Sequence, residues 1–272
     1  MTLKRGIYIL PAIFTLANIA CGMMSIFSSV EGVFATAAWL IIIAIVLDMI
    51  DGRVARLTNT QSLFGVNLDS FADLISFGVA PSFMMYKMVL AKLANPGAAI
   101  AVFYVIAVTL RLAKFNVKAI ESDGESESFF EGLPSPAGAG ILASFVLSYE
   151  LFEAGQQITV KTIPIIEKRM PFFLKSIPVM MVLVSLLMIS TLRYAGFKKV
   201  KFNRAQSFQV LALAIISFLL ILSYPQNTIF IIFICYLASG IIGYIIRLWK
   251  ISHGKILEAR RNREQQARNN QL

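Results

Sequence analysis

Long apolar runs dominate the sequence, and the second of them passes from Val33 to Leu47 without a charged residue. About 20 such residues are needed for one helix to cross a bilayer. Of the 272 residues, 57% are hydrophobic and only 15% are charged, which excludes an ordinary soluble domain and a disordered chain. The sequence predicts an all-α polytopic membrane protein with about eight transmembrane helices. The predicted spans are 9–29, 33–57, 62–92, 97–118, 135–153, 170–193, 206–223 and 226–249.

Basic residues lie mainly at alternate ends of these spans. Lys and Arg concentrate in cytoplasmic loops of membrane proteins, so the pattern predicts a multi-pass protein of the cell (inner, cytoplasmic) membrane with both termini in the cytoplasm. The net charge of +10 then reflects attraction to anionic lipid head groups, and no nucleic-acid partner is expected. Residues 1–250 are predicted to form a membrane-embedded catalytic domain, and residues 251–272 a basic polar cytoplasmic tail.

Histidine and cysteine are too scarce for several kinds of site. The two cysteines, Cys21 and Cys235, lie in apolar runs, and His253 is the single histidine. A disulfide framework, a thiolate zinc site and a Ser–His–Asp triad are therefore excluded. Any polar chemistry must come from carboxylates, basic side chains and the backbone.

Four of the five aspartates fall within 26 residues, at Asp48, Asp51, Asp69 and Asp73. A carboxylate near membrane depth is costly and points to function. The first two are spaced i,i+3 and the last two i,i+4, so each pair shares one face of a helix. A short polar connection, 58–62, joins the two segments. Two antiparallel helices would therefore direct four carboxylates toward one place.

Four adjacent carboxylates cannot all stay ionised without cations. Oxygen ligands favour Mg²⁺ or Mn²⁺, with Ca²⁺ also possible, and two such ions could clamp a phosphate for in-line displacement. Gly52 and Gly65 would let a ligand approach the backbone, and Arg53 and Arg56 could neutralise phosphate oxygens. The alternative is a charge network that anchors helix ends, which suits the arginines better than the four ordered acids.

The spacing Asp48-x-x-Asp51-Gly52-x-x-Ala55-Arg56, followed after eight residues by Gly65-x-x-x-Asp69-x-x-x-Asp73, resembles the signature of the CDP-alcohol phosphatidyltransferases. Members of this family transfer a phosphatidyl-type group from a CDP-linked lipid to an alcohol and release CMP. The resemblance implies a core of six membrane helices, a homodimer, and a divalent-metal site that opens to the cytoplasm.

The resemblance also implies roles for individual residues. Asp48, Asp51, Asp69 and Asp73 would bind metal, and Asp73 would also act as the general base. A further group would bind the CDP-lipid, although Thr15 and Asn18 could instead serve helix–helix hydrogen bonding. The residues of this group are Thr15, Asn18, Gly52, Arg53, Ala55, Arg56, Gly65 and Ser70.

Three further stretches resemble the phosphatidylserine synthase branch of the family: 69–81, 111–116 and 130–139. A zwitterionic acceptor needs a cation for its carboxylate and acceptor groups for its ammonium. Positive-inside anchoring is the alternative for Lys114 and Arg193, and a solvated loop is the favoured interpretation of the acidic segment 121–131. The candidate serine-binding residues are Arg111, Lys114, Asn116, Ser135 and Arg193.

The branch implies that the phosphatidyl group of CDP-diacylglycerol passes to the hydroxyl of L-serine, giving phosphatidylserine and CMP. Glycerol 3-phosphate or an inositol phosphate remains open as the acceptor in the same chemistry. A divalent-cation transporter is the alternative from another class, but no second cluster of aspartates pairs with the first, as paired transporter halves would suggest.

Overall fold

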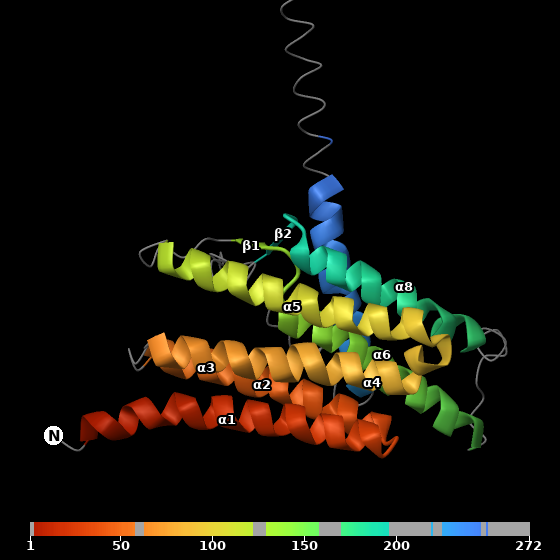
Figure 1. The fold of residues 1–272 in the computed structure, drawn as a ribbon, viewed down its shortest axis with the longest axis horizontal. Coiled ribbons are helices and arrows are strands. Elements are labelled where there is room, and N and C mark those ends of the chain that lie inside the picture. Colours follow the sequence, from red (N-terminus) through yellow and green to blue (C-terminus); the bar gives the residue numbers. More distant parts are fainter. Residues whose placement is uncertain are drawn as a thin grey trace, which may run out of the picture.

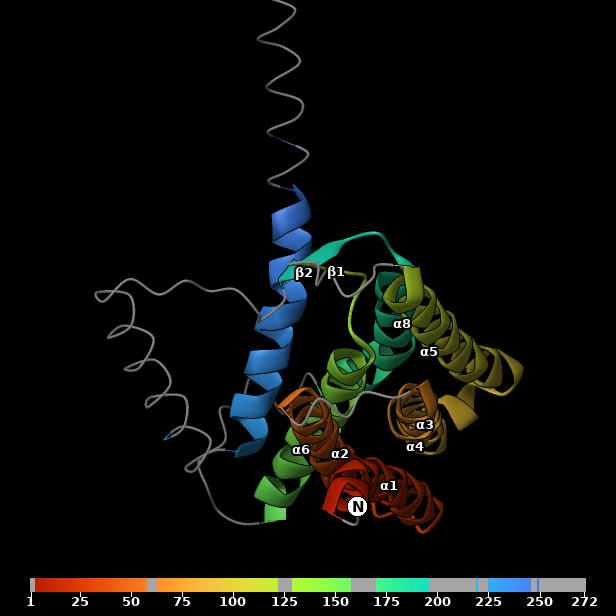
Figure 2. The same ribbon diagram turned by 90° about the vertical axis from the view of Figure 1, so that its left-hand side faces the viewer.

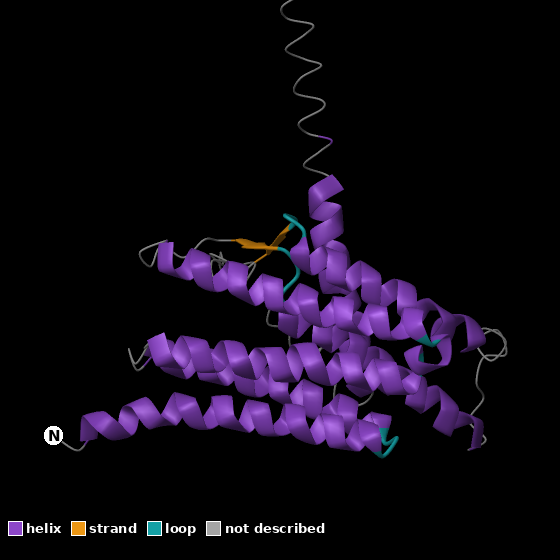
Figure 3. Cartoon of the chain, in the orientation of Figure 1, coloured by secondary structure: helices purple, strands orange, loops and turns teal. Residues whose placement is uncertain are grey.

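The computed structural model describes residues 3–57, 63–121, 129–157, 170–195, 219, 225–245 and 249. Long helices run side by side in one bundle, and Figure 2 shows this bundle nearly end-on. A backbone in lipid must satisfy its own hydrogen bonds, which explains why these apolar runs are helical. The predicted all-α class is confirmed, with one pair of three-residue strands as its exception (Figure 3).

The first two predicted spans form an antiparallel helix pair. They are α1 (Leu3–Val30) and α2 (Phe34–Leu57), which contact each other extensively. Gly32, at φ +82°, lies between them, and the amide of Val33 donates to the carbonyl of Ser28 at 2.9 Å. This is the glycine-assisted end of a helix, where a left-handed residue lets the last carbonyls find partners. The chain therefore reverses within three residues.

The third predicted span, 62–92, is helical but not uniform. It consists of α3 (Leu63–Asp73), a π-helical turn η1 (Leu74–Val79), α4 (Ala80–Met88) and a short 3₁₀ turn η2 (Leu90–Leu93). The polar connection 58–62 lies outside the described residues. Single π turns within α-helices often occur at functional sites, and this one begins directly after Asp73.

Three more helices complete the labelled bundle (Figure 1). They are α5 (Asn95–Glu121), α6 (Ser135–Gln157) and α8 (Met170–Ile189). The predicted span 170–193 is too long at its end, because the chain leaves the helix after Ile189 and enters strand β2 (Arg193–Ala195). This strand pairs antiparallel with β1 (Phe129–Glu131), so the end of the acidic segment 121–131 is a strand rather than a solvated loop.

The C-terminal helix (Pro225–Ile245) covers most of the last predicted span. It crosses the bundle at a steep angle in both views. Four described helices are long and apolar enough to cross a membrane, and shorter apolar segments lie within α6 and α8. The span 206–223 falls outside the described residues apart from Leu219, and so does the tail 251–272. The number eight therefore stays a prediction.

Small residues let the helices pack closely around α2. Ala37, Ala38, Ile41 and Ala44 are fully buried along one face of α2, which packs against α1 and α6. Helices in a membrane associate through such close contacts, because lipid supplies little hydrophobic drive between them. This packing holds α2, which carries Asp48 and Asp51 in its C-terminal half, against its neighbours.

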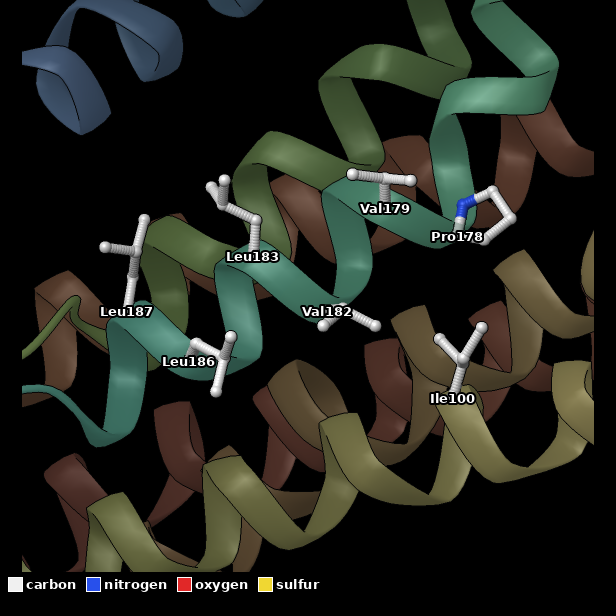
Figure 4. Close-up of a pocket in the computed structure, with 7 residues that line it drawn as sticks. All are labelled: Ile100, Pro178, Val179, Val182, Leu183, Leu186 and Leu187. Carbon is white, nitrogen blue, oxygen red and sulfur yellow. The ribbon is translucent and has the colours of Figure 1, made fainter.

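An apolar cavity of about 580 Å³ lies between α5 and α8 (Figure 4). Its lining is aliphatic throughout and suits contact with hydrocarbon rather than with a charged head group. None of the candidate site residues lines it. The lining residues are Ile100, Pro178, Val179, Val182, Leu183, Leu186 and Leu187.

Candidate active site

Three carboxylates from two helices come together in the bundle. One oxygen from each of Asp48, Asp69 and Asp73 lies within 4.8 Å of the other two. Asp48 comes from α2, and Asp69 and Asp73 come from successive turns of α3. Asp73 is 8% exposed, and its Oδ1 atom has no hydrogen-bond partner among the described residues. This oxygen-only donor set fits a hard divalent cation, whereas thiol or imidazole ligands would favour zinc.

Asp51 lies beside this group of three rather than within it. Its carboxylate is 5% exposed and accepts a hydrogen bond from the hydroxyl of Thr15 on α1. It is also close enough to interact electrostatically with Asp48 and Asp69. We call Asp51 and the group of three the acidic centre. The first helix contacts this centre through Thr15, which is one of the candidate CDP-lipid residues.

One hydrogen bond to α1 and one from α5 hold the π turn that follows Asp73. The hydroxyl of Ser76 donates to the carbonyl of Asn18 at 2.8 Å, and the hydroxyl of Tyr104 donates to the carbonyl of Phe77 at 3.1 Å. A Cβ atom on Gly22 would collide with Ser76, so only glycine permits this approach of α1 to η1. These contacts fix the helix that carries Asp69 and Asp73 relative to α1.

Asn18 lies one turn after Thr15 and is fully buried. Neither its side-chain oxygen nor its side-chain nitrogen has a hydrogen-bond partner among the described residues. Helix–helix hydrogen bonding, the alternative role for this side chain, is therefore not observed. A buried amide without partners is costly, and a polar ligand in the site would offset that cost.

The other candidate CDP-lipid residues lie around the ends of α2 and α3. Gly52 and Arg53 are exposed, and a Cβ atom on Gly52 would meet nothing within 4 Å. Ala55 and Gly65 are half-buried. The side chain of Arg56 lies outside the described part of the structure. Open space beside Gly52 leaves room for a ligand next to Asp51.

Two candidate serine-site residues are joined by a direct hydrogen bond. The Nη1 atom of Arg111 on α5 donates to the hydroxyl oxygen of Ser135, at the start of α6, over 2.6 Å. Arg111 also interacts electrostatically with Asp48 and Asp73. Its Nε atom is buried and has no partner among the described residues. Arg111 therefore offers a donor for an anionic group next to the carboxylates.

The remaining candidates are distributed around this centre. Asn116 on α5 donates to the hydroxyl oxygen of Ser70 on α3 at 2.8 Å, which connects the two sets of candidates. Lys114 forms an ion pair with Glu131 of β1 at 3.2 Å. Arg193 pairs with Glu131 through the strand register, and its side chain is outside the described atoms. The structure thus gives Lys114 a protein partner, which weakens its case as a substrate-binding cation.

Two tyrosines that no sequence motif indicates lie close to this group of residues. Tyr236, on the C-terminal helix, interacts electrostatically with Arg111, and the Tyr194 ring of β2 lies against the Tyr236 ring. Both residues lie in the part of the sequence that carries little recognisable motif. Residues 193–195 pair with residues 129–131, and this pairing helps to position Tyr194. No local sequence pattern predicts it.

Comparison with known proteins agrees with the acidic motif. The family model described as CDP-alcohol phosphatidyltransferase matches residues 8–167. A CDP-diacylglycerol--serine O-phosphatidyltransferase of Helicobacter pylori (strain ATCC 700392 / 26695) is 37% identical over 252 residues, covering 92% of this chain and 96% of that protein.

Proteins with the same name from two other bacteria match a shorter region. The one from Mycobacterium tuberculosis (strain ATCC 25618 / H37Rv) is 39% identical over 150 residues, covering 52% of this chain and 51% of that protein. The one from Bacillus subtilis (strain 168) is 36% identical over 140 residues, covering 52% of this chain and 76% of that protein. The chain belongs to the CDP-alcohol phosphatidyltransferase family.

Proposed function

We propose that this protein is a CDP-diacylglycerol–serine O-phosphatidyltransferase, which transfers the phosphatidyl group of CDP-diacylglycerol to L-serine. The observation that carries the proposal is the meeting of Asp48, Asp69 and Asp73 beside Arg111. Family membership supports the CDP-lipid donor, and the Helicobacter pylori relative, similar over nearly its whole length, supports serine as the acceptor.

The carboxylates are proposed to hold two divalent cations, Mg²⁺ or Mn²⁺, with Asp51 adding a ligand beside the group of three. Bound there, such ions would offset negative charge on the diphosphate and on the departing CMP. The Thr15 hydroxyl orients the Asp51 carboxylate through its hydrogen bond. Thr15, Asn18, Arg53, Arg56 and the backbone near Gly52 would surround the CDP head group.

The reaction is a single displacement at the lipid-side phosphorus. Asp73 accepts the proton of the serine hydroxyl, and the serine oxygen forms a bond to this phosphorus. The bond from the same phosphorus to the CMP oxygen breaks, which gives phosphatidylserine and CMP. The buried Oδ1 atom of Asp73, which has no partner among the described residues, supports this assignment because it is available to take the proton.

Arg111 is the residue proposed to bind the carboxylate of serine. Its Nη1 atom is held by Ser135, which orients the guanidinium, and its Nε atom is available for an anion. Charge-assisted hydrogen bonds of this kind are about twice as strong as neutral ones. Asn116 supports the site from α5 through its bond to Ser70.

The setting of the enzyme is part of the proposal. We place it in the cytoplasmic membrane as a homodimer, with the acidic centre and both termini on the cytoplasmic side. The apolar helices support the membrane location, and the alternation of basic residues in the sequence supports the orientation.

A competition assay tests the acceptor. Purified protein receives CDP-diacylglycerol, Mg²⁺ or Mn²⁺, and equal concentrations of labelled L-serine, glycerol 3-phosphate or inositol phosphate, and CMP release is followed. We expect CMP and labelled lipid with L-serine. CMP release only with a phosphorylated acceptor would keep the family chemistry and contradict serine as the substrate.

A further inference from the structure

A pair of tyrosines from the C-terminal part of the chain lies near Arg111, one of the candidate serine-site residues. The ring centroids of Tyr194 and Tyr236 are 5.6 Å apart, with 32° between the ring planes. Tyr194 belongs to strand β2, and Tyr236 to the C-terminal helix. Both residues lie beyond the region 8–167 that the family model matches. We call Tyr194 and Tyr236 the tyrosine pair.

One member of the tyrosine pair, Tyr236, lies within electrostatic range of Arg111. Tyr236 interacts electrostatically with the Arg111 guanidinium, whose Nη1 atom is held by Ser135 at 2.6 Å. The two substituents on the α-carbon of serine, a carboxylate and an ammonium, are separated by only two bonds. A group that binds the ammonium must therefore lie near the cation that binds the carboxylate. Tyr236 is near enough to Arg111 to interact with it electrostatically, and the Tyr194 ring packs beside Tyr236.

The hydroxyl of Tyr194 is buried and unused. Tyr194 is 0% exposed, and its hydroxyl has no hydrogen-bond partner among the described residues. Burial, and then the neighbouring Tyr236, raise the pKa of Tyr194 to about 12, so the phenol stays neutral near neutral pH. A buried hydroxyl without a partner is costly, and a ligand N–H that donates to its oxygen would offset this cost.

Two of the other candidate acceptors near Arg111 have partners in the described part of the structure. The hydroxyl oxygen of Ser135 accepts from Arg111, and Glu131 pairs with Lys114. We propose that the Tyr194 hydroxyl and the ring of Tyr236 bind the ammonium group of an amino-alcohol acceptor while Arg111 binds its carboxylate. This inference rests on the proposed function, since it assumes an acceptor of this class.

The Tyr194 ring packs directly against the backbone of the C-terminal helix at Gly240. A Cβ atom on Gly240 would collide with the ring of Tyr194, so the ring occupies the space that a side chain would fill. Gly243, one turn further along the same helix, has nothing within 4 Å of the corresponding position. The contact at Gly240 lets the C-terminal helix approach β2 closely and sets the position of the Tyr194 ring.

Steady-state kinetics of Tyr194→Phe test the proposal. The substitution keeps the ring and removes the hydroxyl, so we expect the KM for L-serine to rise about tenfold or more, the usual weight of a hydrogen bond to a charged group. The KM for CDP-diacylglycerol and the thermal midpoint should not change. Tyr244→Phe is the control, because Tyr244 lies on the same helix as Tyr236 and is 43% exposed.

An inhibitor without the ammonium separates the two halves of the acceptor. The inhibition constant of 3-hydroxypropionate against L-serine should be the same in wild type and Tyr194→Phe, since only the Arg111 half of the site would bind it. An inhibition constant that rises as much as the serine KM would overturn the assignment of Tyr194 to the ammonium. An unchanged serine KM, or an equal rise in both substrate KM values, would also overturn it.

Gly240→Ala provides a second test that leaves both tyrosines in the chain. The added methyl group displaces the Tyr194 ring, so the serine KM should rise, whereas Gly243→Ala should leave it unchanged. Equal serine KM values for the two alanine variants would contradict the proposal. Failure of the proposed function is distinguishable, because the wild-type protein would then release no CMP in response to L-serine.

Discussion

At the scale of single residues, Asp73 combines a place in the acidic group with an oxygen that has no hydrogen-bond partner among the described residues. Asp48 and Asp69 supply the neighbouring oxygens within 4.8 Å, and Asp73 is nearly fully buried. The three side chains come from two helices, so none of them forms the site alone. This arrangement is the basis for assigning the proton transfer to Asp73.

Asp73→Asn should lower the turnover number by about a hundredfold or more, because the amide cannot accept the hydroxyl proton. Initial rates of CMP release at saturating substrates measure the effect. Asp123→Asn, which changes the one aspartate outside the cluster, is the control and should stay near wild type. Turnover of Asp73→Asn near the wild-type value would refute the base assignment.

Thr15 is a second residue that affects the site, through its hydrogen bond to Asp51. Thr15→Val keeps the shape of the side chain but removes the donor to the buried carboxylate. Groups that orient a metal ligand typically contribute about ten- to a hundredfold in metal affinity or activity. We therefore expect at least a tenfold higher concentration of Mg²⁺ or Mn²⁺ for half-maximal activity.

The matched control for this variant is Thr109→Val. Thr109 is exposed, and its hydroxyl bonds to the carbonyl of Val105 within the same helix. Its loss should leave the metal dependence unchanged. The same metal requirement in Thr15→Val and Thr109→Val would show that the Thr15–Asp51 hydrogen bond has no part in metal binding.

At the scale of elements, the π turn η1 and its contact with α1 position the helix that carries Asp69 and Asp73. Gly22→Ala places a methyl group against Ser76, where the α1–η1 approach leaves no room. Overpacking of this kind costs about 1–3 kcal/mol and shifts the backbone. We expect a lower thermal midpoint in detergent together with reduced CMP release.

Gly243→Ala provides the comparison for Gly22→Ala, because its added methyl group meets nothing within 4 Å. It should keep the wild-type midpoint and rate. A Gly22→Ala protein with wild-type stability and activity would mean that the close approach of α1 to η1 does not hold the site.

The sequence predicted most helices, because an uncharged run of about 20 residues has few alternatives in a membrane. It did not predict the π turn within 62–92. This turn is held by two hydrogen bonds between segments far apart in the sequence, which Ser76 and Tyr104 donate to backbone carbonyls. It also extended the span ending at 193 too far, since the pairing of β1 with β2 is a long-range contact.

The candidate site was also predictable only where the signal is local in the sequence. The i,i+3 and i,i+4 spacings of the aspartates are local, and the structure brings Asp48, Asp69 and Asp73 together as expected. The protein partner of Lys114 was not predictable, because Glu131 approaches it only through the fold. Tyr194 and Tyr236 were missed for the same reason: their place beside Arg111 depends on contacts between distant segments.

At the scale of the whole molecule, the distribution of basic residues predicts which side of the membrane each end occupies. A tag placed after Leu272 should be accessible to protease in inside-out vesicles and protected in right-side-out vesicles, because Lys and Arg retain their flanking segments in the cytoplasm. Immunoblots of the tag after proteolysis measure this. Protection in inside-out vesicles would reverse the proposed orientation.

The fold places aspartates of α2 and α3 near Arg111 of α5. We propose that the acidic centre transfers a phosphatidyl group only with a divalent cation bound. The most direct measurement follows labelled phosphatidylserine and CMP made by chelator-treated protein, before and after Mg²⁺ or Mn²⁺ is added back. Asp48→Asn is assayed beside the wild type, with Asp123→Asn as the control.

We expect no product from chelator-treated wild type, recovery of both products in equal amounts when the cation returns, and no recovery in Asp48→Asn. Recovery in Asp123→Asn should match the wild type. Full activity after chelation, or full recovery in Asp48→Asn, would contradict the account. Absence of CMP with every alcohol tested, from folded protein, would contradict the enzyme and favour a divalent-cation transporter.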